Sequence, residues 1–209
     1  DIVICDLIED FTDRSIRHRQ LPISDDPHTV LKNWYHNVIH MSCCNKLVRR
    51  SVYLDKTILP WPGLNMWEDN GLSPRLLYYA SKISYVSDAA YHYNKMNVGA
   101  MTSGYGIKQV EQMLCIASNL SDFFSSKPDV ENYRKTIDAF KYLARINLIT
   151  DSFTNYKRFR TTFPDSKYIA GELDRHAFSK KGRIRYFMVS HGFALLFILM
   201  FKINNLFRR

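Results

Sequence analysis

Apolar and polar positions divide the chain into a mixed amino-terminal part and a helical remainder. Ile2 to Cys5 is a short apolar run rich in β-branched residues, which predicts a buried strand. Residues 9–20 are charged and lack a hydrophobic period, which predicts a loop or a weak hairpin. Asp26 and the proline after it form a good helix start, with Asp26 as N-cap, so we expect a helix to about His40.

The next stretch predicts alternating short helices and strands. Residues 44–50 are amphipathic and strongly basic, which predicts a second short helix. A loop marked by proline and glycine covers residues 59–65, and a helix-like run over residues 72–80 follows. Aromatic residues then alternate with others over residues 83–93 around a Ser-Asp turn, which predicts two short strands or one strand with a break.

From Gly106 onward the apolar positions recur with a helical period. One predicted helical face contains Val110, Met113, Leu114, Ala117, Leu120 and Phe124, and the next contains Val130, Tyr133, Ile137, Phe140 and Ala144. The pattern therefore predicts three parts: a mixed α/β part over residues 1–105, a helical region over 106–179, and a basic, hydrophobic helix over 180–209.

The last part contains a long apolar run. Of the sixteen residues from Tyr186 to Phe201, only Ser190, His191 and Gly192 are not plainly hydrophobic. As one helix this run spans about 24 Å, short of the roughly 30 Å hydrocarbon core of a bilayer. Cationic residues flank both ends, which favours a helix lying in the membrane surface. The alternative is a buried helix that packs on the preceding helices.

Charge points to anionic partners. The chain has 29 Lys and Arg against 20 Asp and Glu, a net charge of +9. From Lys180 to the end, seven positive charges meet no acidic residue. Such an imbalance attracts nucleic acid, anionic lipid or phosphorylated small molecules. Because the charges are not interleaved with aromatic residues in a groove-reading motif, we expect an anionic membrane surface through residues 180–209, and no nucleic acid.

Cysteine usage and the first residues predict the compartment and the extent of the chain. Its four cysteines, Cys5, Cys43, Cys44 and Cys115, form no CxxC pair, so a reduced, cytoplasmic setting is expected. Hydrophobic residues make up 46% of the chain and aromatic residues 14%, which excludes a disordered protein. The chain opens within a predicted strand without Met or a signal peptide, so we expect it to be part of a longer protein.

The candidate chemistry lies in a triplet, Trp67-Glu68-Asp69, between the 59–65 loop and the following helix. Paired carboxylates beside two indoles, Trp61 and Trp67, are typical of a general base in a sugar-binding site. The alternative is ordinary helix chemistry, since acidic residues in a first helical turn complement the helix dipole.

Five stretches in order resemble the family-2 glycosyltransferases of GT-A fold, particularly bacterial enzymes of surface-polysaccharide synthesis. They are Asp1-Ile2-Val3-Ile4-Cys5-Asp6, Asn45-Lys46-Leu47-Val48-Arg49-Arg50-Ser51, Pro62-Gly63-Leu64-Asn65-Met66-Trp67-Glu68-Asp69, Leu76 to Ile83, and Tyr91-His92-Tyr93-Asn94. The resemblance covers roughly residues 1–105. It implies an α/β fold: a partial GT-A (Rossmann-like) domain, followed by the α-helical carboxyl-terminal region.

The resemblance also implies a mechanism. A sugar passes from a nucleotide-sugar donor to a glycan or lipid-linked acceptor with inversion, and Asp69 takes the proton of the attacking hydroxyl. Glu68 orients the loop or holds an acceptor hydroxyl. Trp67 and Trp61 stack on a sugar face, unless they serve core packing. Asn45 and Lys46 brace the catalytic loop, unless Lys46 belongs to a solvated helix face.

One part of the family pattern is missing. The family holds Mg²⁺ or Mn²⁺ with an upstream Asp-x-Asp motif, and this chain has no such motif in a suitable place. The metal ligands and the donor site are therefore expected in the full-length enzyme, at the inner face of the plasma membrane, and the fragment alone is expected to be inactive. The alternative function is a non-catalytic, basic helical module that binds anionic membrane or nucleic acid.

Overall fold

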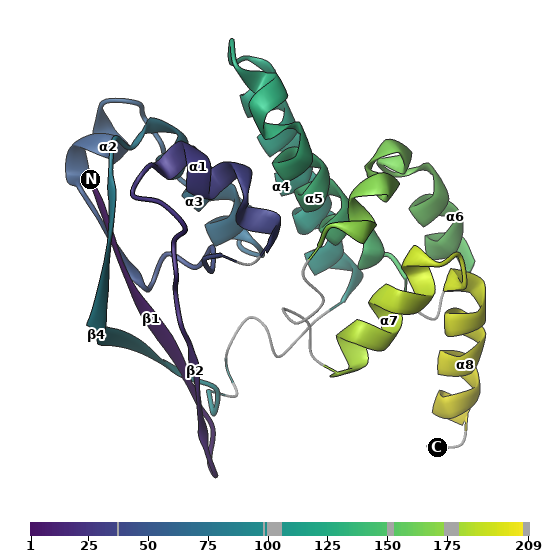
Figure 1. Cartoon of the computed structure of the whole chain (residues 1–209). Coiled ribbons are helices and arrows are strands. Elements are labelled where there is room, and N and C mark those ends of the chain that lie inside the picture. Colours follow the sequence, from purple (N-terminus) through teal and green to yellow (C-terminus); the bar gives the residue numbers. More distant parts are fainter. Residues whose placement is uncertain (37, 98, 100–105, 150–152, 174–179, 207–209) are drawn as a thin grey trace. The chain divides into compact units, whose positions relative to one another are not determined.

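The computed structural model describes residues 1–36, 38–97, 99, 106–149, 153–173 and 180–206 (Figure 1). The chain forms two compact units, residues 1–120 and residues 121–209, and each is described by itself. Helix α4 (Ile107–Ser125) runs across the boundary between them.

A small mixed sheet is the frame of the first unit. Its central strand, β1 (Ile2–Asp10), pairs in parallel along its whole length with β4 (Ile83–Asn94). On the other edge, β1 pairs antiparallel with β2 (Ser15–His18) at one end and with β3 (Lys46–Val48) at the other. The pairing of β1 with β4 shifts register between Cys5 and Asp6, so the broken-strand alternative for residues 83–93 is confirmed.

Short helices accompany this sheet. These short helices are α1 (Pro27–Lys32), η1 (Trp34–His36), α2 (Arg50–Leu54) and α3 (Glu68–Tyr79), and the longer α4 follows them in the chain. The predicted helix start is confirmed, because the Asp26 carboxylate accepts from the backbone N–H groups of His28 and Thr29. The core of the unit combines alternate strand residues with one stripe of each helix. Its buried members include Ile2, Ile4, Ile83, Leu31, Leu76 and Leu77.

The second unit is helical, as predicted. After the end of α4 it contains η3 (Val130–Tyr133), α5 (Arg134–Ile146), α6 (Phe153–Thr161), η4 (Pro164–Gly171), α7 (Lys180–Ser190) and α8 (Ala194–Leu206). Large aromatic side chains dominate its core. Those that are fully buried are Phe124, Tyr133, Phe140, Tyr142 and Tyr186.

Two predictions of local structure are corrected and a third is resolved. The helix that begins at Asp26 ends at Lys32 rather than near His40, and a 3-10 turn follows. Residues 44–50 are not a helix, because residues 46–48 form β3 and exchange main-chain bonds with β1. For the charged segment over residues 9–20 the hairpin alternative is confirmed, since β1 continues to Asp10 before β2 returns.

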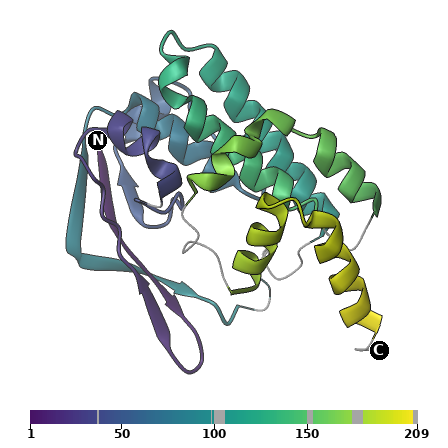
Figure 2. The same ribbon diagram turned by 45° about the vertical axis from the view of Figure 1, so that its right-hand side comes forward.

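The apolar run over residues 186–201 is two helices rather than one. Helices α7 and α8 meet at a sharp corner (Figure 1 and Figure 2). Gly192 adopts a φ of +87° there, a backbone conformation that a continuous helix does not contain. The buried-helix alternative holds in part, because Tyr186, Val189, Ala194 and Ile198 are buried. No helix within the described ranges is both long and apolar enough to cross a membrane.

The mixed α/β character of the first part and the helical character of the remainder are confirmed. The Rossmann-like identity of the sheet and the three-part division at residues 105 and 179 stay predictions. Residues 100–105 and 174–179, which flank the predicted boundaries, lie outside the described residues.

Candidate active site

The site begins where β3 joins β1. Lys46 lies opposite Ile4 in the antiparallel register. Just before it, Asn45 is only 1% exposed, and its side-chain Nδ2 donates to the Cys5 carbonyl at 2.9 Å. The Cys5 N–H donates back to the Asn45 carbonyl at 3.0 Å. Asn45 therefore fastens the start of β3 to the middle of β1.

The Lys46 ammonium closes the preceding segment into a compact loop. Its Nζ donates to the carbonyls of His40 and Ser42, each at 2.5 Å, and to Asn45 Oδ1 at 3.0 Å. These bonds use all three of its protons. Desolvation lowers the pKa of Lys46 to about 8, and the charge of Asp69 opposes part of this shift. Lys46 thus braces residues 40–45. The alternative, that Lys46 lies on a solvated helix face, is wrong.

Glu68 and Asp69 occupy the first turn of α3, which begins before the predicted helical run over residues 72–80. Trp67 is the N-cap and has a φ of 68°, a left-handed conformation that is uncommon for a large side chain. Burial and the neighbouring charge of Asp69 raise the pKa of Glu68. Ser73, one helical turn after Asp69, lies 3.4 Å from the Cys43 sulfur through its Oγ, so α3 brings this side of its first turns to the loop that Lys46 holds.

Two further titratable residues in this loop were not singled out from the sequence. Burial, with a hydrogen bond to Asp69 and its charge, raises the pKa of Cys43 to about 12, so its thiol stays protonated at neutral pH. His40 is exposed as a residue, yet desolvation of its ring and the charge of Lys46 lower its pKa. Neither residue has a motif in the sequence, because only the fold brings them to Asp69.

Hydrogen bonds at both ends of the first turn fix α3 in place. On one side, Ser73 Oγ donates to the Met41 carbonyl at 2.6 Å. On the other, Gln112 Oε1 accepts from the backbone N–H groups of Asn65 and Met66 at 2.9 and 2.8 Å. The loop that leads into the acidic triplet is therefore held by α4.

Trp61 packs inside the first unit. The guanidinium of Arg75 lies over its ring, 3.8 Å from the centroid, and Arg75 Nη2 donates to the Leu59 carbonyl at 2.8 Å. A β-carbon added at Gly71 would lie 2.8 Å from the Trp61 ring, so only glycine allows this approach. These contacts are those expected if Trp61 serves core packing rather than sugar stacking. They anchor the 59–65 loop to α3.

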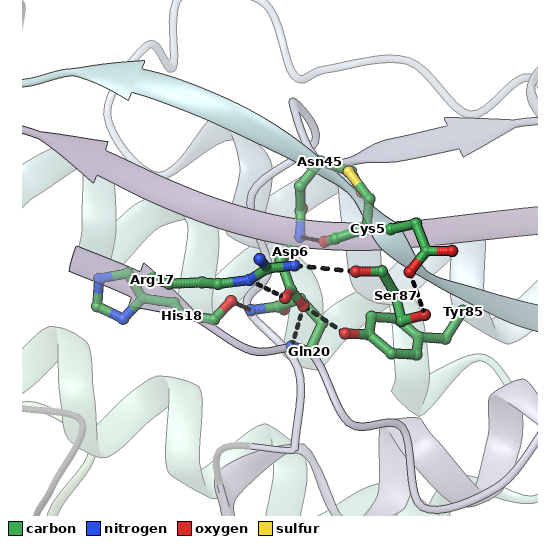
Figure 3. Close-up of polar contacts among 9 residues, drawn as sticks. Cys5, Asp6, Arg17, His18, Gln20, Asn45, Tyr85 and Ser87 are labelled. Carbon is green, nitrogen blue, oxygen red and sulfur yellow. Dashed lines mark hydrogen bonds and ion pairs between the residues drawn. The ribbon is translucent and has the colours of Figure 1, made fainter. Parts of the chain in front are cut away.

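A buried carboxylate ties the strands together close to the site (Figure 3). Asp6 is 0% exposed and accepts from Arg17 Nε at 2.6 Å, the Gln20 N–H at 2.9 Å and the Tyr85 hydroxyl at 2.6 Å. Burial opposes its ionisation, but the hydrogen bonds and the charge of Arg17 outweigh burial and lower the pKa of Asp6. Its partners come from distant segments, so the sequence analysis did not identify this network.

The described residues do not fit a metal site. Within them, no group of three or more His, Cys, Asp or Glu side chains could hold a metal ion. Because Mg²⁺ and Mn²⁺ take several oxygen ligands, Glu68 and Asp69 alone do not make such a site.

Comparison with known proteins shows a similarity to a protein from a bacterium. Over 147 residues the chain is 28% identical to "Putative glycosyltransferase EpsH" of Bacillus subtilis (strain 168). That stretch covers 67% of this chain and 42% of the relative, so the chain spans less than half the length of this relative. No model of a known protein family matches the chain.

Proposed function

We propose that this chain forms the acceptor side of a glycosyltransferase that uses a nucleotide-sugar donor, with Asp69 as the general base. The observation that carries the proposal is the position of Asp69, in the first turn of α3 beside the loop that Lys46 closes. The similarity to a protein named as a glycosyltransferase supports the same reaction class.

The proposed reaction is a single displacement with inversion. An acceptor hydroxyl attacks the anomeric carbon from the face opposite the nucleoside diphosphate. As the new C–O bond forms, the hydroxyl proton passes to the Asp69 carboxylate, and the bond to the diphosphate oxygen breaks. Because a neutral hydroxyl is a poor nucleophile, removal of its proton in the transition state lowers the barrier.

The neighbours of Asp69 have supporting roles in this proposal. Glu68, beside Asp69 in the first turn of α3, is proposed to hold an acceptor hydroxyl. Trp67 offers an indole face for a sugar ring. Asn45 and Lys46 keep the 40–45 loop against α3 through the bonds described above.

The donor half of the reaction is assigned to residues outside this chain. Mg²⁺ or Mn²⁺ would neutralise the leaving diphosphate there, and no step above depends on a metal held by the residues described here. The acceptor is proposed to be a glycan or a lipid-linked sugar.

The experiment is a transfer assay with the complete gene product that contains this chain. A panel of nucleotide sugars is incubated with candidate acceptors, nucleoside diphosphate release is measured, and the anomeric configuration of the product is determined by NMR. We expect acceptor-dependent release and a product whose anomeric configuration is opposite to that of the donor. Retained configuration would contradict the single displacement, and absence of transfer across the panel would favour the non-catalytic alternative.

We further propose that the enzyme works at the inner face of the plasma membrane and that residues 180–209 bind its anionic surface. The support is a set of large apolar side chains left exposed on α7, on α8 and at the corner between them. They are Ile184, Phe187, Phe193, Leu195, Leu196, Leu199 and Met200. Exposed apolar side chains near basic residues are typical of helices that lie in the headgroup region.

Replacement of Leu196 and Leu199 by glutamate is expected to weaken vesicle binding by at least about tenfold, because each leucine loses its favourable transfer into lipid. The measurement is flotation with vesicles that contain phosphatidylglycerol. Leu54→Glu is the matched control, since Leu54 is equally exposed but lies on α2. If the natural chain and the double variant float equally with the vesicles, α7 and α8 are not the membrane contact.

A further inference from the structure

A cavity in the second unit has the features of an anion site. It has a volume of about 240 Å³ and lies among α5, α6, η4 and the corner between α7 and α8. Its polar and charged lining residues are Tyr142, Arg145, Tyr156, Arg160 and Lys167. None of the residues that line it is acidic.

Arg145 places an unbalanced positive charge in the wall of this cavity. The residue is 4% exposed, and its Nη atoms donate only to carbonyl oxygens, those of Phe159, Phe163 and Pro164, at 2.7–3.2 Å. Within the described part of the chain it forms no ion pair with a carboxylate. A buried cation without a counter-charge is costly, so the site favours an anion.

Two buried polar atoms in the same wall have no hydrogen-bond partner among the described residues. They are the Nε of Arg145 and the hydroxyl of Tyr142, a residue that is 1% exposed. Desolvation raises the pKa of Tyr142, so its hydroxyl keeps its proton and can donate. Native proteins leave few such donors unpaired, and a ligand oxygen would satisfy both.

The mouth of the cavity adds further positive charge. Arg160 on α6 and Lys167 on η4 are exposed and line it. With Arg145 they give three cationic groups around one cavity, which suits a doubly charged anion better than a single carboxylate. Tyr156, Phe159 and Val189 give the remaining wall an aromatic and apolar character.

We propose that this cavity binds the phosphate group of a phosphorylated ligand, with Arg145 Nε and the Tyr142 hydroxyl as donors and Arg160 and Lys167 as the outer charges. The aromatic wall contacts the organic part of the ligand. The ligand is either a soluble phosphate ester or a phospholipid headgroup. The site lies entirely within the second unit and does not depend on the assignment of Asp69.

The test is calorimetric titration of the 209-residue chain with inorganic pyrophosphate at constant ionic strength. We expect Arg160→Gln to weaken binding about tenfold, the loss of one charge-assisted contact. Tyr142→Phe is expected to weaken binding about fivefold without lowering the melting temperature in phosphate-free buffer, because it removes an unpaired hydroxyl. Lys157→Gln is the matched control, since Lys157 is exposed on the same helix but does not line the cavity.

Flotation with vesicles that contain phosphatidic acid distinguishes the two sources. Variant-sensitive binding of pyrophosphate alone identifies a soluble phosphate ligand, and variant-sensitive flotation identifies a lipid headgroup. Equal behaviour of Arg160→Gln, Tyr142→Phe and Lys157→Gln in both assays, or no binding in either, would overturn the proposal.

Discussion

Asp6→Asn is expected to lower the free energy of unfolding by about 2–3 kcal/mol, one of the largest stability effects of a single substitution in this chain. The carboxylate accepts three hydrogen bonds, from Arg17, Gln20 and Tyr85, on three different segments. An amide keeps the shape but turns one acceptor into a donor. That donor faces the Arg17 guanidinium or the Tyr85 hydroxyl, and the ion pair with Arg17 is lost. The measurement is urea unfolding at pH 7.

Asp13→Asn is the matched control. Asp13 also pairs with an arginine, Arg14 at 3.0 Å, but its side chain is 71% exposed. Exposed ion pairs contribute little, so the loss is expected to stay below about 0.5 kcal/mol. Equal effects of the two substitutions would show that the buried network of Asp6 contributes no more than a surface pair.

The effect of Asp6→Asn depends on pH in a defined direction. The folded protein lowers the pKa of Asp6 relative to the unfolded chain. Its carboxylate therefore stabilises the fold above the unfolded pKa of about 4, and this contribution is lost as pH falls through the folded pKa. The difference in stability between the natural chain and Asp6→Asn should be constant from pH 5 to 7 and shrink below pH 4. A difference that grows in acid would contradict this account.

Features set by local chemistry were predictable from the sequence. The helix cap at Asp26 was predicted because a side chain two residues away satisfies the first N–H groups. The buried stripe with Leu72, Leu76 and Leu77 on α3 follows from a helical period, although the helix begins earlier than predicted, at Glu68. These signals lie within a few residues of one another.

Features set by distant contacts were not predictable in the same way. Residues 46–48 have an amphipathic pattern, but β1, more than forty positions earlier, provides main-chain partners that make them a strand. The Asp6 carboxylate accepts hydrogen bonds from residues 11, 14 and 79 positions away, and no pattern of neighbouring residues predicts these partners. Gly192 breaks the apolar run because its φ is positive, a choice that composition alone does not reveal.

The candidate site also combines residues that were predictable from the sequence with a geometry that depends on distant contacts. Glu68 and Asp69 were predicted from their place between a loop and a helix, and Asn45 and Lys46 from a resemblance. Their geometry follows from the pairing of β3 with β1, which sets Asn45 against Cys5 and turns the Lys46 ammonium into the 40–45 loop. His40 and Cys43 join the site only through that loop.

Asp69→Asn is expected to reduce the turnover of the complete gene product by about 10²–10⁴-fold, the usual contribution of a general base. An amide cannot accept the proton of the acceptor hydroxyl, yet it keeps the size of the side chain and leaves Lys46 bonded to its three oxygens. The loss of charge in the first turn of α3 should cost only about 0.3–1 kcal/mol of stability. Urea unfolding of the variant checks that the fold is intact.

Two substitutions control for this effect. Asp55→Asn makes the same chemical change at an exposed position near the end of α2 and should leave turnover within about twofold of the natural enzyme, as is usual for a surface substitution away from the chemistry. Glu68→Gln changes the neighbouring carboxyl, and the account expects it to raise the KM for the acceptor more than it lowers kcat. A larger loss of kcat in Glu68→Gln than in Asp69→Asn would exchange the roles of the two residues.

The most direct test of the general-base assignment measures turnover and donor affinity together in the Asp69→Asn enzyme. Nucleoside diphosphate release is followed at saturating acceptor, and the Kd for the nucleotide sugar is determined by titration without acceptor. We expect a turnover reduced at least about 10²-fold with a donor Kd within about twofold of the natural value. Turnover close to that of the natural enzyme would contradict the assignment of Asp69 as the base.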